Sequence, residues 1–480
     1  MKALLVNTNL MRPPVAPVGL DYLADSIRAA GHEPMLLDLC FSADVKADIE
    51  AASRQGPHLI GCTVRNTDDC YFASGAFFLS GIRDIIASLR RCSGAPVVLG
   101  GVGFSVMPEA VVEFCGADYG IAGEGEEAIV RLLGALEKRS DPARLPDADR
   151  IPGLVFRSER GMRRSPAVDL DLEQLPSRTR SFLDNRRYFT EGGQAGFETR
   201  RGCPRSCIYC ADPVAKGRRT RLLPPRRVVD ELRALLGQGI DHLHTCDPEF
   251  NVPLAHAHDV CRAMIANGLG DRIRWFAYCS PAPFDEETAV LMRRAGCAGI
   301  DFGADSGNDR MLHRLGRQFR AADLETTARA CRQAAIPFMY DLMLGGPDET
   351  VDSLRESLDL VRRIGPDCVG ISLGVRVYEG TPLADEVRRT GPMETNPALR
   401  GERLGNGQFL RPVFYLSPGL GPDPAALVRD AVGDDPRFFL PGGREEARDY
   451  NYNDNEILER AIRDGARGAY WDILRRMRAV

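Results

Sequence analysis

The feature that most constrains the fold is an alternation of short apolar segments with amphipathic helical segments, which occurs twice along the chain. The first run predicts strands over residues 2–7, 34–39, 59–64, 96–99 and 116–121. Between them, residues 17–30 and 82–89 have helical periodicity, and Gly31 follows the first helix as a terminating glycine. Strands that alternate with helices form a parallel sheet, so residues 1–135 are predicted to be a doubly wound, Rossmann-like α/β domain.

A second alternation covers residues 192–385. Its predicted strands are residues 195–199, 240–245, 273–278, 299–303, 338–344 and 368–373. Six such units with helices between them predict a partial (β/α)6 barrel of the TIM type, whose chemistry lies at the carboxyl ends of the strands. Residues 136–191 break the pattern and are predicted to be a linker with a short hairpin around Glu159-Arg160-Gly161. Residues 386–480 are predicted to be a small mixed domain that ends in a helical run over 457–477.

The composition argues against several classes of function. The chain has 480 residues, with 62 Lys and Arg against 67 Asp and Glu, so its formal net charge is −5. Nucleic-acid-binding proteins usually carry a strongly basic surface, so we expect no nucleic-acid partner. No apolar run reaches the ~18 residues of a membrane span and no signal segment precedes the first strand, so we expect a cytoplasmic protein with no membrane span. The fourteen cysteines are not expected to form a disulfide framework.

Three of the cysteines are clustered directly after the first predicted barrel strand. Cys203, Cys207 and Cys210 have the spacing C-x3-C-x2-C on a loop that contains Gly202 and Pro204. Three thiolates this close can surround one soft metal centre. A structural zinc site needs a fourth Cys or His, and the next fifteen residues contain neither. An iron–sulfur cluster with one open iron fits best, and the alternatives are a chance grouping or a zinc site with a remote ligand.

This cysteine motif resembles the signature of the radical S-adenosylmethionine (radical SAM) superfamily. In that family the three cysteines hold a [4Fe–4S] cluster, and its open iron binds the methionine part of S-adenosylmethionine (SAM). The resemblance extends to the ends of the following strands, where family members hold the methionine amino group, the ribose and the nucleoside. It implies a set of SAM-contacting residues: Tyr209, Asp247, Glu249, Tyr278, Ser280, Asp305 and Ser306. For Asp247 and Glu249 the alternative is a solvated loop.

The amino-terminal sheet joined to this barrel resembles the cobalamin-binding branch of the same superfamily. Doubly wound sheets bind ligands beyond the carboxyl ends of their strands, and three of the four predicted strand ends are rich in small residues that let a bulky ligand approach. The likeness implies a cobalamin site formed by Arg65, Asn66, Gly100, Gly101, Gly103, Gly123 and Glu124.

The domain departs from the wider cobalamin-binding pattern in one respect. Many such domains have a D-x-H-x-x-G motif whose histidine binds cobalt, and this sequence lacks it. His32 and His58 both lie in predicted turns and are expected to be ordinary loop residues. We expect Arg65, at the end of a central strand, to lie below the corrin ring, where a guanidinium has no lone pair to offer cobalt. The alternative is a salt-bridged loop arginine.

The resemblance implies a cobalamin-dependent radical SAM methyltransferase. Its substrate would be an unactivated carbon or phosphorus centre of a small metabolite, a natural-product intermediate or a peptide, and its electrons would come from an external flavodoxin or ferredoxin. Three alternatives stay open: a cyclase or oxidoreductase that uses the same cofactors without methyl transfer, a radical SAM enzyme with a vestigial cobalamin domain, and a non-catalytic cobalamin sensor or carrier. The clustered cysteines argue against the last, because a sensor has no use for an open iron.

Overall fold

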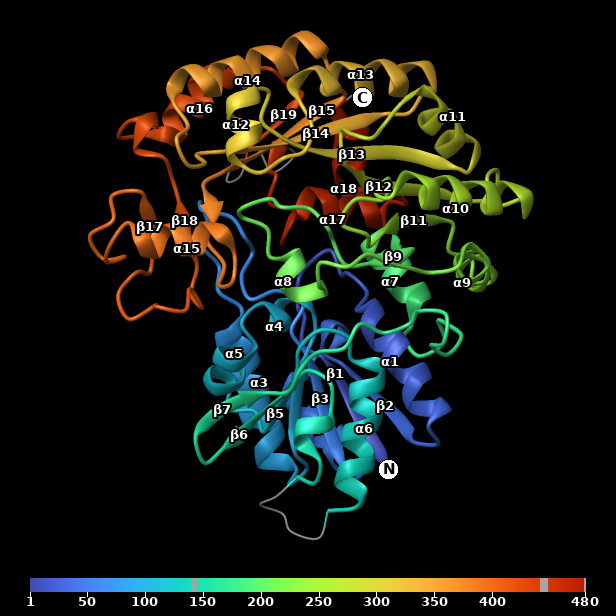
Figure 1. Cartoon of the computed structure of the whole chain (residues 1–480). Coiled ribbons are helices and arrows are strands. Elements are labelled where there is room, and N and C mark those ends of the chain that lie inside the picture. The colour runs from blue at the N-terminus through green and yellow to red at the C-terminus, as the bar shows by residue number, and fades with distance from the viewer. Residues whose placement is uncertain (140–144, 441–447, 479–480) are drawn as a thin grey trace.

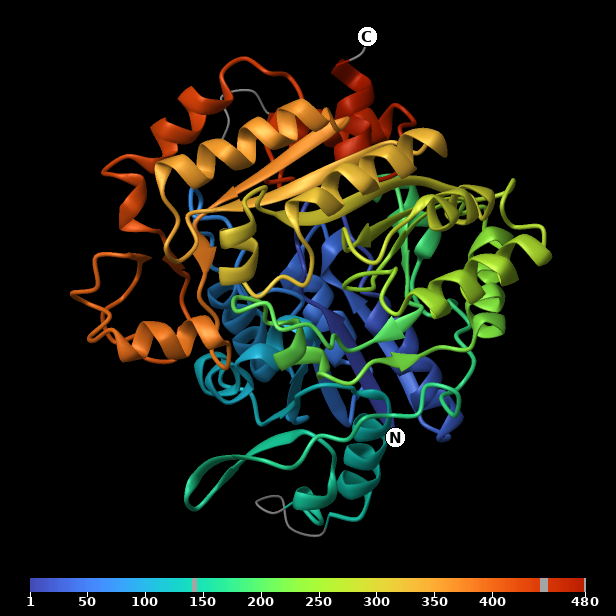
Figure 2. The same cartoon turned by 45° about the horizontal axis from the view of Figure 1, so that its top comes forward.

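An amino-terminal α/β domain and a partial barrel are stacked on one another in the computed structural model of the chain (Figure 1). The structure describes residues 1–139, 145–440 and 448–478. The amino-terminal sheet occupies the lower half of Figure 1 and the barrel the upper half, and Figure 2 shows the carboxyl-terminal helix (red) beside the barrel strands. Within the described ranges, no helix is long and apolar enough to cross a membrane.

Five parallel strands form the centre of the amino-terminal sheet, in the order β2-β1-β3-β4-β5. They are β1 (Lys2–Asn7), β2 (Glu33–Asp38), β3 (Leu59–Thr63), β4 (Val97–Gly100) and β5 (Tyr119–Ile121). The helices of this domain are α1 (Val18–Ala29), α2 (Val45–Ser53), α3 (Leu79–Cys92), α4 (Val102–Val106), α5 (Pro108–Cys115) and α6 (Glu126–Glu137), with a 3-10 turn at Leu39–Phe41. The two faces of the sheet have separate apolar cores under these helices. The predicted doubly wound fold is confirmed.

The hairpin predicted within the linker extends this sheet. Its strands are β6 (Leu154–Ser158) and β7 (Gly161–Arg164), and β6 pairs antiparallel with β5. A 3-10 turn (Ala148–Arg150) precedes the hairpin, and α7 (Asn185–Gly192) leads into the barrel. Part of the predicted linker, residues 140–144, lies outside the described residues.

The barrel sheet has seven parallel strands, in the order β19-β15-β14-β13-β12-β11-β8. The six strands predicted from the sequence are β8 (Ala195–Phe197), β11 (His242–Thr245), β12 (Arg274–Cys279), β13 (Cys297–Asp305), β14 (Phe338–Leu344) and β15 (Cys368–Leu373). The carboxyl-terminal segment adds β19 (Phe438–Phe439). The helices are α9 (Pro225–Gly237), α10 (Leu254–Ala266), α11 (Glu286–Arg294), α12 (Asp309–Arg314), α13 (Ala321–Gln333) and α14 (Val351–Ile364). After β8 the chain forms β9 (Arg200–Arg201), α8 (Asp212–Lys216) and β10 (Arg221–Leu222).

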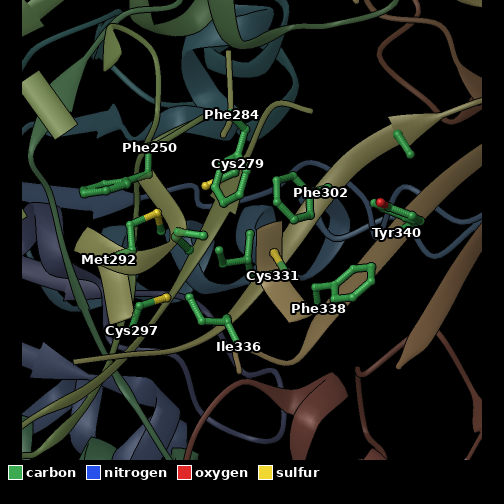
Figure 3. Packing of buried hydrophobic residues seen from close by; sticks show 14 of the residues in the cluster. Phe250, Cys279, Phe284, Met292, Cys297, Phe302, Cys331, Ile336, Phe338 and Tyr340 are labelled. Atoms are coloured by element: carbon green, nitrogen blue, oxygen red, sulfur yellow. The ribbon is translucent and has the colours of Figure 1, made fainter. Parts of the chain in front are cut away.

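Aromatic and sulfur-containing side chains fill the core between the barrel sheet and its outer helices. Figure 3 shows Phe302, Phe338 and Tyr340 from β13 and β14, with Cys331 of α13 beside them. The rings of Phe284 and Phe302 meet edge to face, with centroids 5.0 Å apart. All fourteen cysteines are free, and those in this core pack as small apolar side chains.

The carboxyl-terminal helices α17 (Glu456–Arg463) and α18 (Tyr470–Arg478) cover the inner face of the barrel sheet. Phe276 points to this face while its neighbour Trp275 points to the outer core, and Trp471 of α18 packs on Phe276. The prediction of one helical run over 457–477 is wrong. Gly465 and Gly468 adopt φ angles of 102° and 119° and separate the two helices.

The rest of the carboxyl-terminal segment lies at the side of the barrel. A small antiparallel sheet has the order β16-β18-β17, formed by β16 (Val375–Arg376), β17 (Leu399–Gly401) and β18 (Val413–Tyr415). Helices α15 (Pro382–Arg389) and α16 (Pro424–Val432) and a 3-10 turn (Pro418–Leu420) accompany it. Residues 441–447 and 479–480 of the predicted carboxyl-terminal domain lie outside the described residues.

Candidate functional site

The three clustered cysteines lie on the loop between β9 and α8. Gly202 opens this loop with φ +81°, and a Cβ at this position would come within 2.1 Å of the carbonyl oxygen of Arg219. Only glycine therefore fits this turn. Cys203, Cys207 and Cys210 all line one cavity, which is also bordered by residues from the carboxyl ends of the barrel strands. The motif is thus placed where barrels of this type hold their chemistry.

The donor set of this cavity fits an iron–sulfur cluster. Burial raises the pKa of all three thiols, so they stay protonated until a metal displaces the proton. Among the described residues, no three His, Cys, Asp or Glu side chains are placed to hold a single metal ion. A [4Fe–4S] cluster binds each thiolate through a different iron, so its ligands lie farther apart than those of one ion. Three thiols spread around one cavity suit a cluster better than a zinc ion.

Arg317, which the sequence did not single out, connects the cysteine loop with two carboxylates. Its Nη1 donates to Sγ of Cys207 at 3.1 Å, and it forms ion pairs with Glu249 and Asp305, each at 3.3 Å. Arg205 from the cysteine loop forms a second ion pair with Glu249 at 2.9 Å. Two arginines therefore compensate the two acids beside the cysteines. The charge of Arg317 also opposes the rise that burial causes in the pKa of Cys207.

Four of the seven residues predicted to contact SAM line the cysteine cavity: Tyr209, Glu249, Tyr278 and Asp305. The Tyr209 hydroxyl donates to Asp305 at 2.5 Å. Tyr278 is 45% exposed because its side chain borders the open cavity. These four side chains can reach a ligand beside the cysteines, and their role toward SAM stays a prediction.

The other three predicted residues bond to the protein framework. Asp247 accepts hydrogen bonds from the backbone N–H of Thr199 (2.9 Å) and from its hydroxyl (2.6 Å), so it fixes the backbone after β8. The hydroxyl of Ser306 is 2.8 Å from a serine hydroxyl of α14. Ser280 accepts from Arg205 at 3.2 Å. None of the three lines the cysteine cavity.

A second cavity lies between the carboxyl end of the amino-terminal sheet and the barrel. Four of the residues predicted for cobalamin line it: Gly100, Gly101, Gly123 and Glu124. The sheet contributes apolar and small residues to its wall, and the barrel contributes Lys216, Arg221 and Cys246. This is the edge at which doubly wound sheets bind their ligands. The cavity therefore lies where the sequence predicts cobalamin, although Arg65 and Asn66 do not line it.

Gly101 and Gly103 also position the neighbouring loop. A Cβ on Gly103 would lie 2.7 Å from the carbonyl oxygen of Arg65 and 2.8 Å from Cα of Asn66. A Cβ on Gly101 would lie 2.6 Å from the carbonyl oxygen of Val64. The missing side chains thus let the β4–α4 turn pack directly against the loop after β3. Gly103 does not line the cavity itself.

Arg65 forms no ion pair with any described residue, so the alternative of a salt-bridged loop arginine finds no support. Its Nη1 lies 3.6 Å from Sδ of Met11. Burial raises the pKa of Tyr278 and of Tyr470, and the charge of Arg65 opposes both rises. Arg65 is therefore close to Tyr278 of the barrel and to Tyr470 of α18. Its place below a corrin ring stays a prediction.

The two histidines of the amino-terminal domain lie away from this cavity. Nδ1 of His32 is 3.0 Å from the amino terminus of Met1, and Nδ1 of His58 accepts from the backbone N–H of Lys2 at 2.8 Å. Both contacts are at the start of β1, whereas the cavity is at the carboxyl ends of the strands. Their prediction as loop residues agrees with these positions.

An ion-pair network connects the second cavity with the cysteine loop. Arg201, two residues before Cys203, forms ion pairs with Glu124 (3.0 Å), Glu126 (2.6 Å) and Glu198 (3.1 Å). Glu124 also pairs with an arginine of β10. Burial raises the pKa of Glu124, and the two arginines oppose that rise. The two candidate cofactor sites therefore share one electrostatic framework.

Comparisons with known proteins agree with both halves of this arrangement. Residues 6–133 match the B12 binding domain, and residues 197–361 match the radical SAM superfamily. Tryptophan 2-C-methyltransferase from Streptomyces laurentii is 32% identical to this chain over 97% of this chain and 94% of that protein. The solved structure of the radical SAM methyltransferase TsrM from Kitasatospora setae, with tryptophan and a SAM analogue bound, has a TM-score of 0.91 and 31% identity over 100% of this chain and 98% of that one. The cobalamin-dependent radical SAM enzyme OxsB shares the fold, with a TM-score of 0.71 and 17% identity over 87% of this chain and 64% of that one.

The fold and the two cavities define a cobalamin-binding radical SAM enzyme. The chain belongs to the cobalamin-dependent radical SAM methyltransferases, because its likeness to a member of that family extends over nearly the whole of both chains. The cofactors predicted from the sequence, a [4Fe–4S] cluster, SAM and cobalamin, are those of this family.

Proposed function

We propose that this chain transfers a methyl group from SAM to a carbon atom of a small indole or other aromatic amino acid, with cobalamin as the methyl carrier. The observation that carries the proposal is the 32% identity with a tryptophan 2-C-methyltransferase over 97% of this chain. That match includes the carboxyl-terminal segment as well as the two cofactor domains, so it extends to residues that border the barrel interior.

A group of tyrosines near the cysteine cavity supports an aromatic substrate. The ring of Tyr450 is 5.7 Å from that of Tyr71 and 5.8 Å from that of Tyr452, and both contacts are edge to face. Tyr278 borders the cysteine cavity. These rings come from the amino-terminal domain, the barrel and the carboxyl-terminal segment. Aromatic side chains bury much apolar area and favour edge-to-face or offset contacts with another ring, so they suit an indole.

The chain's own part in this reaction is to bind the cofactors and the substrate, to orient them and to enclose them. Cys203, Cys207 and Cys210 would hold the cluster, and the cavity at the end of the amino-terminal sheet would hold cobalamin. When bound, these groups supply the electron-transfer and methyl-transfer chemistry. We also propose, from composition and family likeness, that an external flavodoxin or ferredoxin supplies electrons, that no nucleic acid takes part, and that the protein is cytoplasmic.

An isotope experiment tests the proposed substrate class. The anaerobically reconstituted full chain, loaded with iron–sulfur cluster and cobalamin, is incubated with SAM that carries a trideuterated methyl group, a reductant and one of a panel of substrates. We expect mass spectrometry to find the deuterated methyl group on tryptophan or a close indole relative, and none when Cys203→Ala replaces the wild type. Conversion of substrate without label would favour a cyclase or oxidoreductase. Equal product without cobalamin would favour a vestigial cobalamin domain.

A further inference from the structure

Two aspartates lie next to each other inside the barrel, and neither belongs to the residues assigned above to a cofactor. Asp301 on β13 and Asp341 on β14 point to the same face of the sheet, because Asp341 pairs with Gly303, two residues beyond Asp301. Asp301 is only 3% exposed, and Oδ1 of each carboxyl has no donor among the described residues. Two carboxyls this close share one proton, which leaves the pair with a single negative charge.

No cation in the described part of the chain compensates this charge. Neither aspartate forms an ion pair there, and no Lys, Arg or His is among the groups that act on them. Burial raises the pKa of both carboxyls, that of Asp341 to about 6, and the hydrogen bond between them keeps the proton on Asp301. Near neutral pH, Asp341 is therefore a partly buried carboxylate that has no cationic partner among the described residues. Such a group is costly unless a cation joins it.

The surroundings of the pair favour a cation. Gly370 on β15 lets Asp341 and Tyr450 pack closely against the strand, since a Cβ there would lie 2.4 Å both from Oδ1 of Asp341 and from the Tyr450 ring. Tyr450 donates a hydrogen bond that opposes the rise in the pKa of Asp341, and Tyr71 and Tyr278 are close enough to feel its charge. Aromatic faces attract ammonium groups, so these rings add to the attraction of the carboxylate.

The pair is also within reach of a ligand. Asp341 and Tyr278 both line the cavity that contains Cys203, Cys207 and Cys210. A molecule placed beside the cysteines would therefore lie next to Asp341.

We infer that the Asp301–Asp341 pair binds the ammonium group of the substrate. This inference rests on the proposed function, because it takes the substrate to be an amino acid or a related amine. A pair with one negative charge matches one alkylammonium, and holding that group fixes the orientation of the aromatic ring relative to the cysteine cavity. SAM also carries an ammonium group, so the test has to separate the two sources.

Calorimetric titration of the full chain, loaded with cluster and cobalamin, tests the inference with four probes. L-Tryptophan and tryptamine carry the ammonium group, indole-3-propanoate lacks it, and SAM is titrated separately. We expect the wild type to bind tryptophan and tryptamine about 30-fold or more tightly than indole-3-propanoate. The variant Asp301→Asn/Asp341→Asn should lose that preference and bind indole-3-propanoate and SAM as before. Asp271→Asn, an exposed turn residue, is the control and should change nothing.

Each result decides between the inference and its rivals. Equal wild-type affinity for tryptophan and indole-3-propanoate overturns the inference while the proposed function stands, and this comparison needs no variant to fold. A double variant that loses SAM binding alone assigns the pair to SAM and overturns the inference. A double variant that binds tryptophan normally yet forms no product makes the pair a proton acceptor and also overturns it. If no indole binds to the wild type, the proposed substrate class is wrong, and the inference falls with it.

Discussion

Replacing Arg201 by Met tests the electrostatic connection between the cysteine loop and the cobalamin cavity. The Arg201 side chain is 11% exposed and pairs with Glu124, Glu126 and Glu198. In the variant, Glu124 and Glu198 each keep another arginine, but Glu126 keeps no cationic partner in the described part of the chain. Removing one partner of a buried ion pair costs about 3–5 kcal/mol. Since only one carboxylate is left alone, we expect the free energy of unfolding to fall by about 3 kcal/mol.

Urea denaturation, followed by circular dichroism, measures this loss. Adding Glu126→Gln to the Arg201→Met variant removes the unpaired charge and should recover part of the lost stability, because the energies of contacting residues are coupled. Arg219→Met is the matched control. Its side chain is 69% exposed, so its effect should stay within about 0.5 kcal/mol. Wild-type stability for Arg201→Met, or no recovery in the double variant, would refute the reasoning.

Three further predictions concern the cofactor sites and pH. Alanine at any of the clustered cysteines Cys203, Cys207 and Cys210 should remove the iron–sulfur absorption and the bound iron. Alanine at the exposed Cys92 should retain both. Iron retained by a variant with alanine at all three clustered cysteines would place the cluster elsewhere. Arg65→His should still bind cobalamin, since Arg65 has no ion pair to lose among the described residues, and should show nitrogen superhyperfine splitting in the electron paramagnetic resonance of the cob(II) form. The same splitting in the wild type would contradict the expectation that Arg65, which cannot bind cobalt, lies below the corrin ring. Burial raises the pKa of Glu349 to about 7, so the folded state holds a proton that the unfolded chain releases above pH ~4.5. The contribution of protonated Glu349 to the free energy of unfolding is therefore complete below pH ~4.5, and it declines by about 3 kcal/mol as the pH rises through 7. Glu349→Gln should flatten this decline in urea titrations at several pH values, and an unchanged slope would assign the decline to other groups.

The strands and the cysteine loop were predictable because their signals are local. Strands β1, β14 and β15 have the ends that their apolar runs predict, and the C-x3-C-x2-C spacing brings its three thiols to one cavity. The helical run over 457–477 was predicted wrongly because apolar periodicity continues across Gly465 and Gly468. The positive φ angles of these glycines break the helix even though the pattern does not.

The charged contacts could not be predicted, because they depend on which strands become neighbours. Arg317 lies 110 residues beyond Cys207 and reaches it only through the closure of the barrel. Asp301 and Asp341 each look like an ordinary strand residue, and only the register that pairs Asp341 with Gly303 brings them together. Asp247 shows the opposite error. Its position at a strand end suggests a ligand contact, but its carboxylate accepts a hydrogen bond from the backbone N–H of Thr199.

The central claim is that this chain passes a methyl group from SAM to its substrate through cobalamin. The most direct test loads the full chain with its cluster and with cobalamin whose methyl carbon is carbon-13, then adds unlabelled SAM and tryptophan and stops the reaction after the first turnover. The account predicts that the first methylated product carries carbon-13 and that later turnovers carry the unlabelled carbon of SAM. A first product without carbon-13 would contradict it.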